Sequence, residues 1–263
     1  MESVANTRPY LLEQWRSGRL SLGVWCSLAE PRAAEVLARQ DFDWACIDMQ
    51  HGYTTRATLP SMIDAITNAG KPSIVRVSWN TPADIMWALD VGAQGILVPM
   101  VESAADARKA VEACRYPPDG SRSFGCLRSG FDPAITEAMD VNRQVACVVM
   151  VETAAAANDV ASIAEVPGVD AVFVGPSDLA LAFGLTPGAD ARNSSEFMQA
   201  MERIAHVAIA HNKPVGVYAG SPELVWRWAD MGYQFMTLES DLGLLGSAAQ
   251  PALAAAREGP SKS

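Results

Sequence analysis

Short apolar runs alternate with longer amphipathic segments along the chain. The apolar runs are mostly continuous, which is typical of parallel strands that are covered on both faces. They predict strands at residues 22–27, 44–48, 73–77, 94–100, 145–151, 171–174, 214–218 and 235–239. The intervening segments carry apolar residues three or four positions apart, as helices do, and several end at Gly or Asn. They predict helices at residues 31–40, 54–70, 82–92, 103–115, 156–168 and 194–212.

This alternation predicts a parallel (β/α)8 barrel, the TIM barrel, as a single domain over residues 1–263 with a flexible tail at 257–263. The chain length of 263 residues agrees with the roughly 250 that this fold needs. A doubly wound sheet is the weaker alternative, because no G-x-G-x-x-G follows the first strand. Residues 116–144 form a long connection, which we expect to be functional or mobile.

Composition and charge exclude several classes of protein. The 20 basic and 30 acidic side chains give a net charge of −10, which disfavours general nucleic-acid binding. No apolar run reaches the roughly 18 residues of a membrane span, and no signal peptide is visible. The five cysteines have no C-x-x-C spacing, so we expect reduced thiols, mostly in the core. The chain is therefore expected to be a cytoplasmic protein that acts on small molecules.

Polar and aromatic side chains occur at the ends of the predicted strands. Catalytic residues of such barrels gather there, because the carboxyl ends of all strands open on one face. The residues at or just past these ends are Trp25, Asp48, His51, Arg76, Glu152, Asp178, Tyr218 and Glu239.

Two carboxylates on neighbouring strands suggest a metal site. Glu152 follows the apolar run CVVMV directly, so its side chain is expected to face the barrel mouth. Together with Asp178 it would supply the usual protein share of a Mg²⁺ or Mn²⁺ site, with water and substrate completing it. The alternative is a pair of rim acids without a ligand. Asp178, in GPSDLA, could instead cap the next helix.

His51 and Arg76 are candidates for chemistry at the same face. A histidine near a metal-bound carbonyl compound can move a proton at neutral pH, although His51 could equally be a helix-start residue without a role. Arg76 interrupts the apolar run SIVRV, so it needs an anion: either a ligand at the mouth or an internal acid. The Gly-led loop at 175–184 could hold a carboxylate through backbone N–H groups, or be an ordinary turn.

Several segments together resemble the HpcH/HpaI aldolase family over residues 20–245. They are DFDWACIDMQH, SIVRV, residues 88–125, VVMVET and VDAVFVGPSDLA. The resemblance implies a metal-dependent class II aldolase that makes or cleaves 4-hydroxy-2-oxo acids, through an enolate of pyruvate or hydroxypyruvate and an aldehyde. It implies Mg²⁺ or Mn²⁺, with Co²⁺ as a further option, and no Schiff-base lysine. Only four lysines are present, and none ends a predicted strand.

The resemblance also implies roles for individual residues. Glu152 and Asp178 match the metal-binding carboxylates, and His51 matches the general base. Asp90, in ALDVGAQG, matches the acid that orients this histidine. Arg76 matches the arginine that contacts the keto oxygen.

Further residues match the substrate pocket. Asp48 matches an acid that holds metal-bound water, and Trp25 matches an aromatic wall. Gly175, Pro176 and Ser177 match the cradle of the substrate carboxylate. With Arg76 and Asp178, these residues and Tyr218 form the expected substrate site. Tyr218, Ser123 and the loop at 116–130 are our candidates for tuning the choice of acceptor aldehyde.

One position departs from the family pattern. Many members carry an acid just before the histidine, where this chain has Gln50. The replacement removes a charge beside the expected base, so the substrates named for other members do not transfer directly. The donor and the acceptor therefore stay open.

The resemblance further implies a homo-oligomer, a hexamer in which the last helix is exchanged between subunits, and a place in aromatic compound catabolism. The segment at 241–257 would suit such an exchange, or a helix packed on its own barrel. Small-molecule 2-oxo acids and aldehydes are the expected partners, without nucleic acid or membrane.

Two other functions remain as alternatives. The first is an acyl-CoA lyase related to the citrate lyase β-chain. It would need a basic surface for CoA, of which we find only Arg115, Arg122 and Arg128 near the long connection. The second is a non-catalytic barrel that binds a 2-oxo acid, which would not need the histidine.

Overall fold

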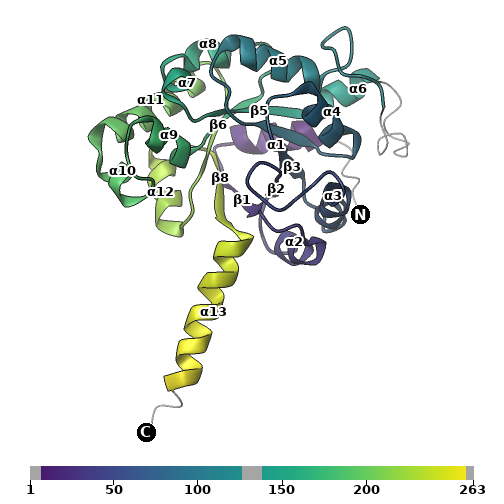
Figure 1. The fold of residues 1–263 in the computed structure, drawn as a ribbon. Helices are drawn as coiled ribbons and strands as arrows, with labels where there is room; N and C mark the ends of the chain where they lie inside the picture. The colour runs from purple at the N-terminus through teal and green to yellow at the C-terminus, as the bar shows by residue number, and fades with distance from the viewer. Residues whose placement is uncertain (1–6, 126–137, 259–263) are drawn as a thin grey trace.

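The chain folds as a closed barrel of eight parallel strands, in which each strand pairs with its sequence neighbour and β8 pairs with β1. The computed structural model describes residues 7–125 and 138–258 (Figure 1). The strands are β1 (Ser21–Cys26), β2 (Trp44–Asp48), β3 (Ser73–Arg76), β4 (Gly95–Val98), β5 (Ala146–Val151), β6 (Ala171–Val174), β7 (Val215–Tyr218) and β8 (Phe235–Ser240). The predicted TIM barrel is confirmed, and the doubly wound alternative is wrong because the sheet closes.

Helices surround the barrel and follow its strands (Figure 1). Those in the described residues are α1 (Thr7–Arg16), α2 (Pro31–Ala38), α3 (Leu59–Asn68), α4 (Pro82–Asp90), α5 (Ala104–Cys114), α6 (Ala138–Gln144), α7 (Ala154–Asn158), α8 (Val160–Glu165), α9 (Pro176–Ala182), α10 (Ala189–Asn193), α11 (Ser195–Ala210), α12 (Pro222–Asp230) and α13 (Asp241–Glu258). Many begin at a Ser or Thr whose hydroxyl accepts a hydrogen bond from a first-turn N–H, as Thr81 does for α4.

Three features differ from the predicted helices. The segment expected as one helix at 156–168 is divided into α7 and α8 at Asp159, whose φ and ψ of −110° and 19° are not helical. The long connection is not structureless, because α6 occupies its last part. The helices α1, α10 and α12 were not predicted. Residues 126–137 of the connection lie outside the described residues.

Aromatic side chains close the amino end of the barrel. Trp15 of α1 is fully buried, and its ring stacks on Phe235 with centroids 4.0 Å apart. Trp44 lies edge-on to Trp15 at 6.5 Å. Gly23 provides the space for the Trp44 indole, since a Cβ at this position would come within 2.5 Å of the ring. The interior is therefore filled at this end, as TIM-barrel cores usually are, and opens at the carboxyl end.

The last helix does not pack along the barrel. Figure 1 shows α13 extending away from it, and Asp241 is its one buried residue. The Asp241 carboxylate accepts hydrogen bonds from the backbone N–H groups of Ser27 and Leu28, at 3.0 and 2.9 Å. Leu242 and Leu245, by contrast, are 47% and 58% exposed. Packing on its own barrel, one of the two alternatives for this segment, is not what the structure shows.

The four described cysteines, at positions 26, 46, 114 and 147, are buried and free, as expected. Cys126 and the end of the predicted tail, residues 259–263, lie outside the described residues. In the part of the chain that the structure describes, no helix is long and apolar enough to span a bilayer.

Candidate active site

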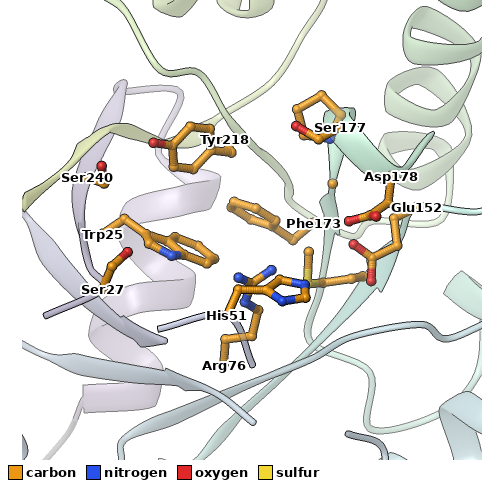
Figure 2. Close-up of a pocket in the computed structure, with 13 residues that line it drawn as sticks. Trp25, Ser27, His51, Arg76, Glu152, Phe173, Ser177, Asp178, Tyr218 and Ser240 are labelled. Carbon is orange, nitrogen blue, oxygen red and sulfur yellow. The ribbon is translucent and has the colours of Figure 1, made fainter. Parts of the chain in front are cut away.

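A cavity of about 260 Å³ opens at the carboxyl end of the barrel (Figure 2). It is lined by Trp25, Ser27, His51, Arg76, Met150, Glu152, Phe173, Gly175, Pro176, Ser177, Asp178, Tyr218 and Ser240. Nine of the predicted site residues are among them, from six different strands or the loops that follow. The closed barrel brings them together, since all its strands end on this face.

Strand register creates an ion pair at the base of the cavity. Asp48 and Arg76 are direct partners across β2 and β3, so their side chains start side by side. Arg76 donates from Nε to Asp48 Oδ1 at 2.9 Å and from Nη2 to Oδ2 at 2.6 Å. Both residues are buried: Arg76 is 8% exposed and Asp48 is 2% exposed. A buried arginine held by two parallel hydrogen bonds is fixed in direction as well as in charge.

The Arg76 guanidinium also has an aromatic contact. It lies 4.7 Å from the centroid of the Trp25 ring, whose Nε1 donates to Asp48 at 3.2 Å. Within the described residues, Arg76 Nη1 carries no hydrogen bond, and Arg76 lines the cavity. Of the two alternatives for Arg76, the internal acid is confirmed as Asp48; the ligand stays a prediction, for which Nη1 remains free in this part of the chain.

Several donors converge on the Asp48 carboxylate. The backbone N–H groups of Gln50 and His51 donate to Oδ1 at 2.9 and 3.2 Å. Burial alone would raise the pKa of this carboxyl, but the hydrogen bonds and charge of Arg76 outweigh it, and the pKa lies below its usual value. The Asp48 carboxylate at the end of β2 thus binds both Arg76 and the backbone of the following turn, and the second contact positions His51.

We expect Asp48→Asn to destabilise the protein by about 3 kcal/mol at neutral pH, because it leaves a buried guanidinium without its counter-charge. The folded pKa of Asp48 lies below the unfolded value of about 3.9, so the stabilisation is present above that pH and is lost as pH falls through the folded pKa. Urea unfolding at pH 7 and at about pH 3.5 should therefore show the difference between the two proteins shrinking in acid. An equal difference at both values would contradict the pairing.

Glu152 is buried at the end of β5 with an incomplete set of partners. Its Oε1 accepts a hydrogen bond from the backbone N–H of Met100 at 2.7 Å. Its Oε2 is buried and has no hydrogen-bond partner in the described part of the protein. Burial raises the pKa of Glu152 to about 7, and the nearby charge of Asp178 adds to this. A carboxylate in this state favours a cation beside it.

Asp178 lies in the first turn of α9, next to Glu152 (Figure 2). The register of β5 and β6 pairs Val151 with Val174, which brings the following residues, Glu152 and Gly175, together. A Cβ on Gly175 would overlap Glu152 Oε2, so only glycine leaves this oxygen room. The N-cap residue of α9 is Gly175, which has no side chain to cap the helix. Asp178 lies in the first turn and is not the N-cap, which was the alternative role for it.

His51 is exposed and lines the cavity together with Arg76 (Figure 2). Asp90, which was expected to orient it, does not line the cavity. Asp90 instead accepts a 2.7 Å hydrogen bond from Nη2 of the buried Arg122. Its proposed action on His51 stays a prediction.

An aromatic wall closes the side opposite the carboxylates. The Tyr218 ring lies edge-on to Trp25, with centroids 5.7 Å apart. Its hydroxyl donates to Glu239 Oε1 at 2.8 Å, and the same oxygen accepts from the backbone of Ser240 at 2.7 Å. Burial and the Glu239 carboxylate raise the pKa of Tyr218 to about 12, so it stays a neutral donor.

Comparison with known proteins identifies the family. The profile described as HpcH/HpaI aldolase/citrate lyase matches residues 21–248, most of the chain. The chain belongs to this family. The hydroxypyruvate/pyruvate aldolase of Rhizorhabdus wittichii is 37% identical over 92% of this chain and 96% of its own length. The 4-hydroxy-2-oxo-heptane-1,7-dioate aldolase of Salmonella typhimurium is 37% identical over 91% of each. The expected class of carbon–carbon lyase, an aldolase, is confirmed.

The fold is shared with solved members of the family. A crystal structure of an HpcH/HpaI aldolase/citrate lyase family protein from Burkholderia cenocepacia has a TM-score of 0.88 at 33% identity, covering 94% of this chain and 99% of that one.

Sequence reasoning missed several cavity residues. Met150, Phe173 and Ser27 lay within predicted strands and Ser240 just past one, and none of the four was singled out as a site residue. Met100, which binds Glu152 through its backbone, has a φ of 54°, rare for a residue with a side chain. Only the fold reveals these roles. Of the acceptor candidates, Tyr218 lines the cavity, Ser123 does not, and part of 116–130 lies outside the described residues.

Proposed function

We propose that this protein is a class II, divalent-metal-dependent aldolase that joins pyruvate or hydroxypyruvate to an aldehyde, and cleaves the resulting 4-hydroxy-2-oxo acid. The observation that carries the proposal is the buried Glu152 with its unpartnered oxygen, beside Asp178 and in the same cavity as Arg76 and His51. Two hard oxygen ligands with room for water suit Mg²⁺ or Mn²⁺, and also Co²⁺.

Glu152 and Asp178 would hold the metal. Their fit is supported by the orphaned Glu152 oxygen, by the space that Gly175 leaves next to it, and by a raised pKa that a nearby dication would lower. When bound, the cation would act as a Lewis acid toward the keto group of a 2-oxo acid.

The remaining residues would bind and orient the substrate. Arg76 Nη1 can donate to the keto oxygen as it gains negative charge, and Asp48 fixes the guanidinium for this task. The backbone N–H of Ser177, at the start of α9, would be available for the substrate carboxylate, whereas Pro176 has no N–H and the N–H of Gly175 donates to Val151 O at 3.4 Å. The rings of Trp25 and Tyr218 exclude water on the other side.

His51 would move the protons. In the synthetic direction its imidazole would take a proton from C3 of the donor; in cleavage it would take the proton of the 4-hydroxyl as the C3–C4 bond breaks, and a proton would return to C3 of the enolate. Its place in the lining of the cavity, together with Arg76, supports this. Lys71 and Lys213, just before β3 and β7, stand at the amino end of their strands, away from the cavity.

Exchange of pyruvate's methyl protons in D₂O with added Mn²⁺ tests the proposal. We expect NMR to show Mn²⁺-dependent deuterium uptake, its loss with EDTA, and a new product when glycolaldehyde is added. Cleavage of malyl-CoA without aldol activity would favour the acyl-CoA lyase. Binding of pyruvate without exchange would favour the non-catalytic barrel.

We further propose that the protein is a homo-oligomer, a hexamer, built by exchange of α13. The support is that α13 leaves its own barrel with Leu242, Leu245 and Leu253 about half exposed. Light scattering should give a mass near six times 28.0 kDa, and truncation after Ser240 should reduce it. An unchanged oligomer after truncation would contradict the exchange. The metal used and the place in aromatic compound catabolism remain predictions.

A further inference from the structure

A second cavity of about 160 Å³ adjoins the first. The two share Pro176, Ser177 and Tyr218 as wall residues, so they lie on either side of the same narrow boundary. Figure 2 shows Ser177 and Tyr218 above Phe173, on the same side of the first cavity. The second cavity therefore begins at a wall of the first.

The walls of the second cavity are mostly apolar. Phe197 of α11 and Trp228 of α12 are almost completely buried, and Leu224 and Ala219 add further apolar surface. The indole Nε1 of Trp228 is buried and has no hydrogen-bond partner in the described residues. A buried donor without a partner is costly, and this one belongs to a side chain that lines the cavity.

Among the described residues, Arg192 is the one charged residue that lines this second cavity. It is half-buried on the short helix α10, and its backbone carbonyl accepts a hydrogen bond from Arg227 at 3.2 Å. Over residues 7–125 and 138–258 its guanidinium has neither an ion pair nor a hydrogen bond. Asp190, two residues earlier, forms no ion pair with it; the Asp190 carboxylate accepts a hydrogen bond from the backbone N–H of Thr186 at 3.1 Å.

The boundary between the cavities is held in place. The Tyr218 hydroxyl is bound to Glu239, and its ring packs against Trp25, so the ring has little freedom to swing across the opening. A chain that passes Tyr218 and Ser177 would enter a cavity with mostly apolar walls and a single cationic side chain, that of Arg192. This combination suits an aldehyde with a short carbon chain and a terminal anion.

We propose that the second cavity binds the distal end of the acceptor aldehyde, and that Arg192 selects acceptors with a terminal oxyanion such as a carboxylate or phosphate. The proposal rests on the proposed aldolase function and adds the substrate class of its acceptor. It also assigns a specificity role to a residue that lies outside the candidate catalytic cavity.

The test compares acceptors that match in shape and differ in charge. The donor is pyruvate with Mn²⁺, and the acceptors are 4-oxobutanoate against 4-oxopentanal, and glyceraldehyde 3-phosphate against glyceraldehyde. We expect the wild type to prefer the anionic member of at least one pair. Arg192→Gln should reduce this preference, the ratio of the two kcat/KM values, by about tenfold or more through a higher KM, as loss of a charge-assisted hydrogen bond does. Which pair responds tells carboxylate from phosphate.

Two further variants keep the test sharp. Arg192→Lys retains the charge and should keep part of the preference, while Arg108→Gln removes an exposed charge on α5 that lines neither cavity and should leave the ratio unchanged. A wild type without charge preference, or the same ratio in Arg192→Gln, overturns the inference. Failure of the proposed function would look different: no deuterium uptake into pyruvate and no product from any aldehyde.

Discussion

Glu152→Gln is expected to lower kcat/KM by more than about 100-fold. Removing a residue that only hydrogen-bonds to a metal ligand costs up to about 100-fold, and removing the ligand's own charge should cost more. Glutamine preserves the shape and can still accept from Met100 N, but it removes the negative charge that would hold the cation. Asp178→Asn should behave alike. The measurement is steady-state aldol synthesis from pyruvate and glycolaldehyde over a range of Mn²⁺ concentrations.

Thermal unfolding separates metal loss from misfolding. Saturating Mn²⁺ should stabilise the wild type, by about 2.7 kcal/mol at 100 times its dissociation constant, and should not stabilise Glu152→Gln. The matched control is Glu202→Gln, since Glu202 is exposed on α11 and remote from the cavity. It should keep both the activity and the Mn²⁺ response. Full activity in Glu152→Gln would rule out the metal site described above.

His51→Ala is expected to reduce turnover by about 100-fold or more, the usual contribution of a positioned general base. His51 lines the cavity, whereas its backbone N–H is one of the groups bound to Asp48. Alanine retains that backbone bond, so the fold around Arg76 should be preserved. Deuterium uptake by pyruvate should fall in parallel with turnover, and Mn²⁺ stabilisation should persist.

The control for this variant is His206→Ala, because His206 is exposed on α11 and lines neither cavity. It should match the wild type. If His51→Ala exchanges pyruvate protons at the normal rate, another group is the base.

Much of the fold was predictable because eight buried parallel strands give a simple sequence pattern, in which continuous apolar runs are separated by amphipathic segments. The strand bounds agree with those predicted to within two residues. The course of α13 was not predictable. A stripe of leucines indicates that a helix will be covered, but it does not say whether its own barrel or another surface covers it.

The candidate site was predictable for a related reason. Once the strands are known, their carboxyl ends define one face, and the polar residues there converge. Arg76 illustrates the limit: its position in an apolar run showed that it needs an anion, but only the register of β2 and β3 identifies Asp48. Asp90 pairs with Arg122, 32 residues further on, which strand order alone cannot reveal.

The second cavity could not be found from sequence at all. Arg192 follows no strand and belongs to no motif, and it reaches the site because α10 folds back between α9 and α11. Specificity residues carried by such loops and short helices depend on packing between distant segments.

The most direct test of the account is anomalous X-ray scattering from crystals soaked with Mn²⁺ and pyruvate. The account predicts one strong peak within coordination distance of both Glu152 and Asp178, with the pyruvate keto oxygen turned toward Arg76. A peak at some other place in the barrel, or full occupancy by pyruvate with no metal near either carboxylate, would contradict it.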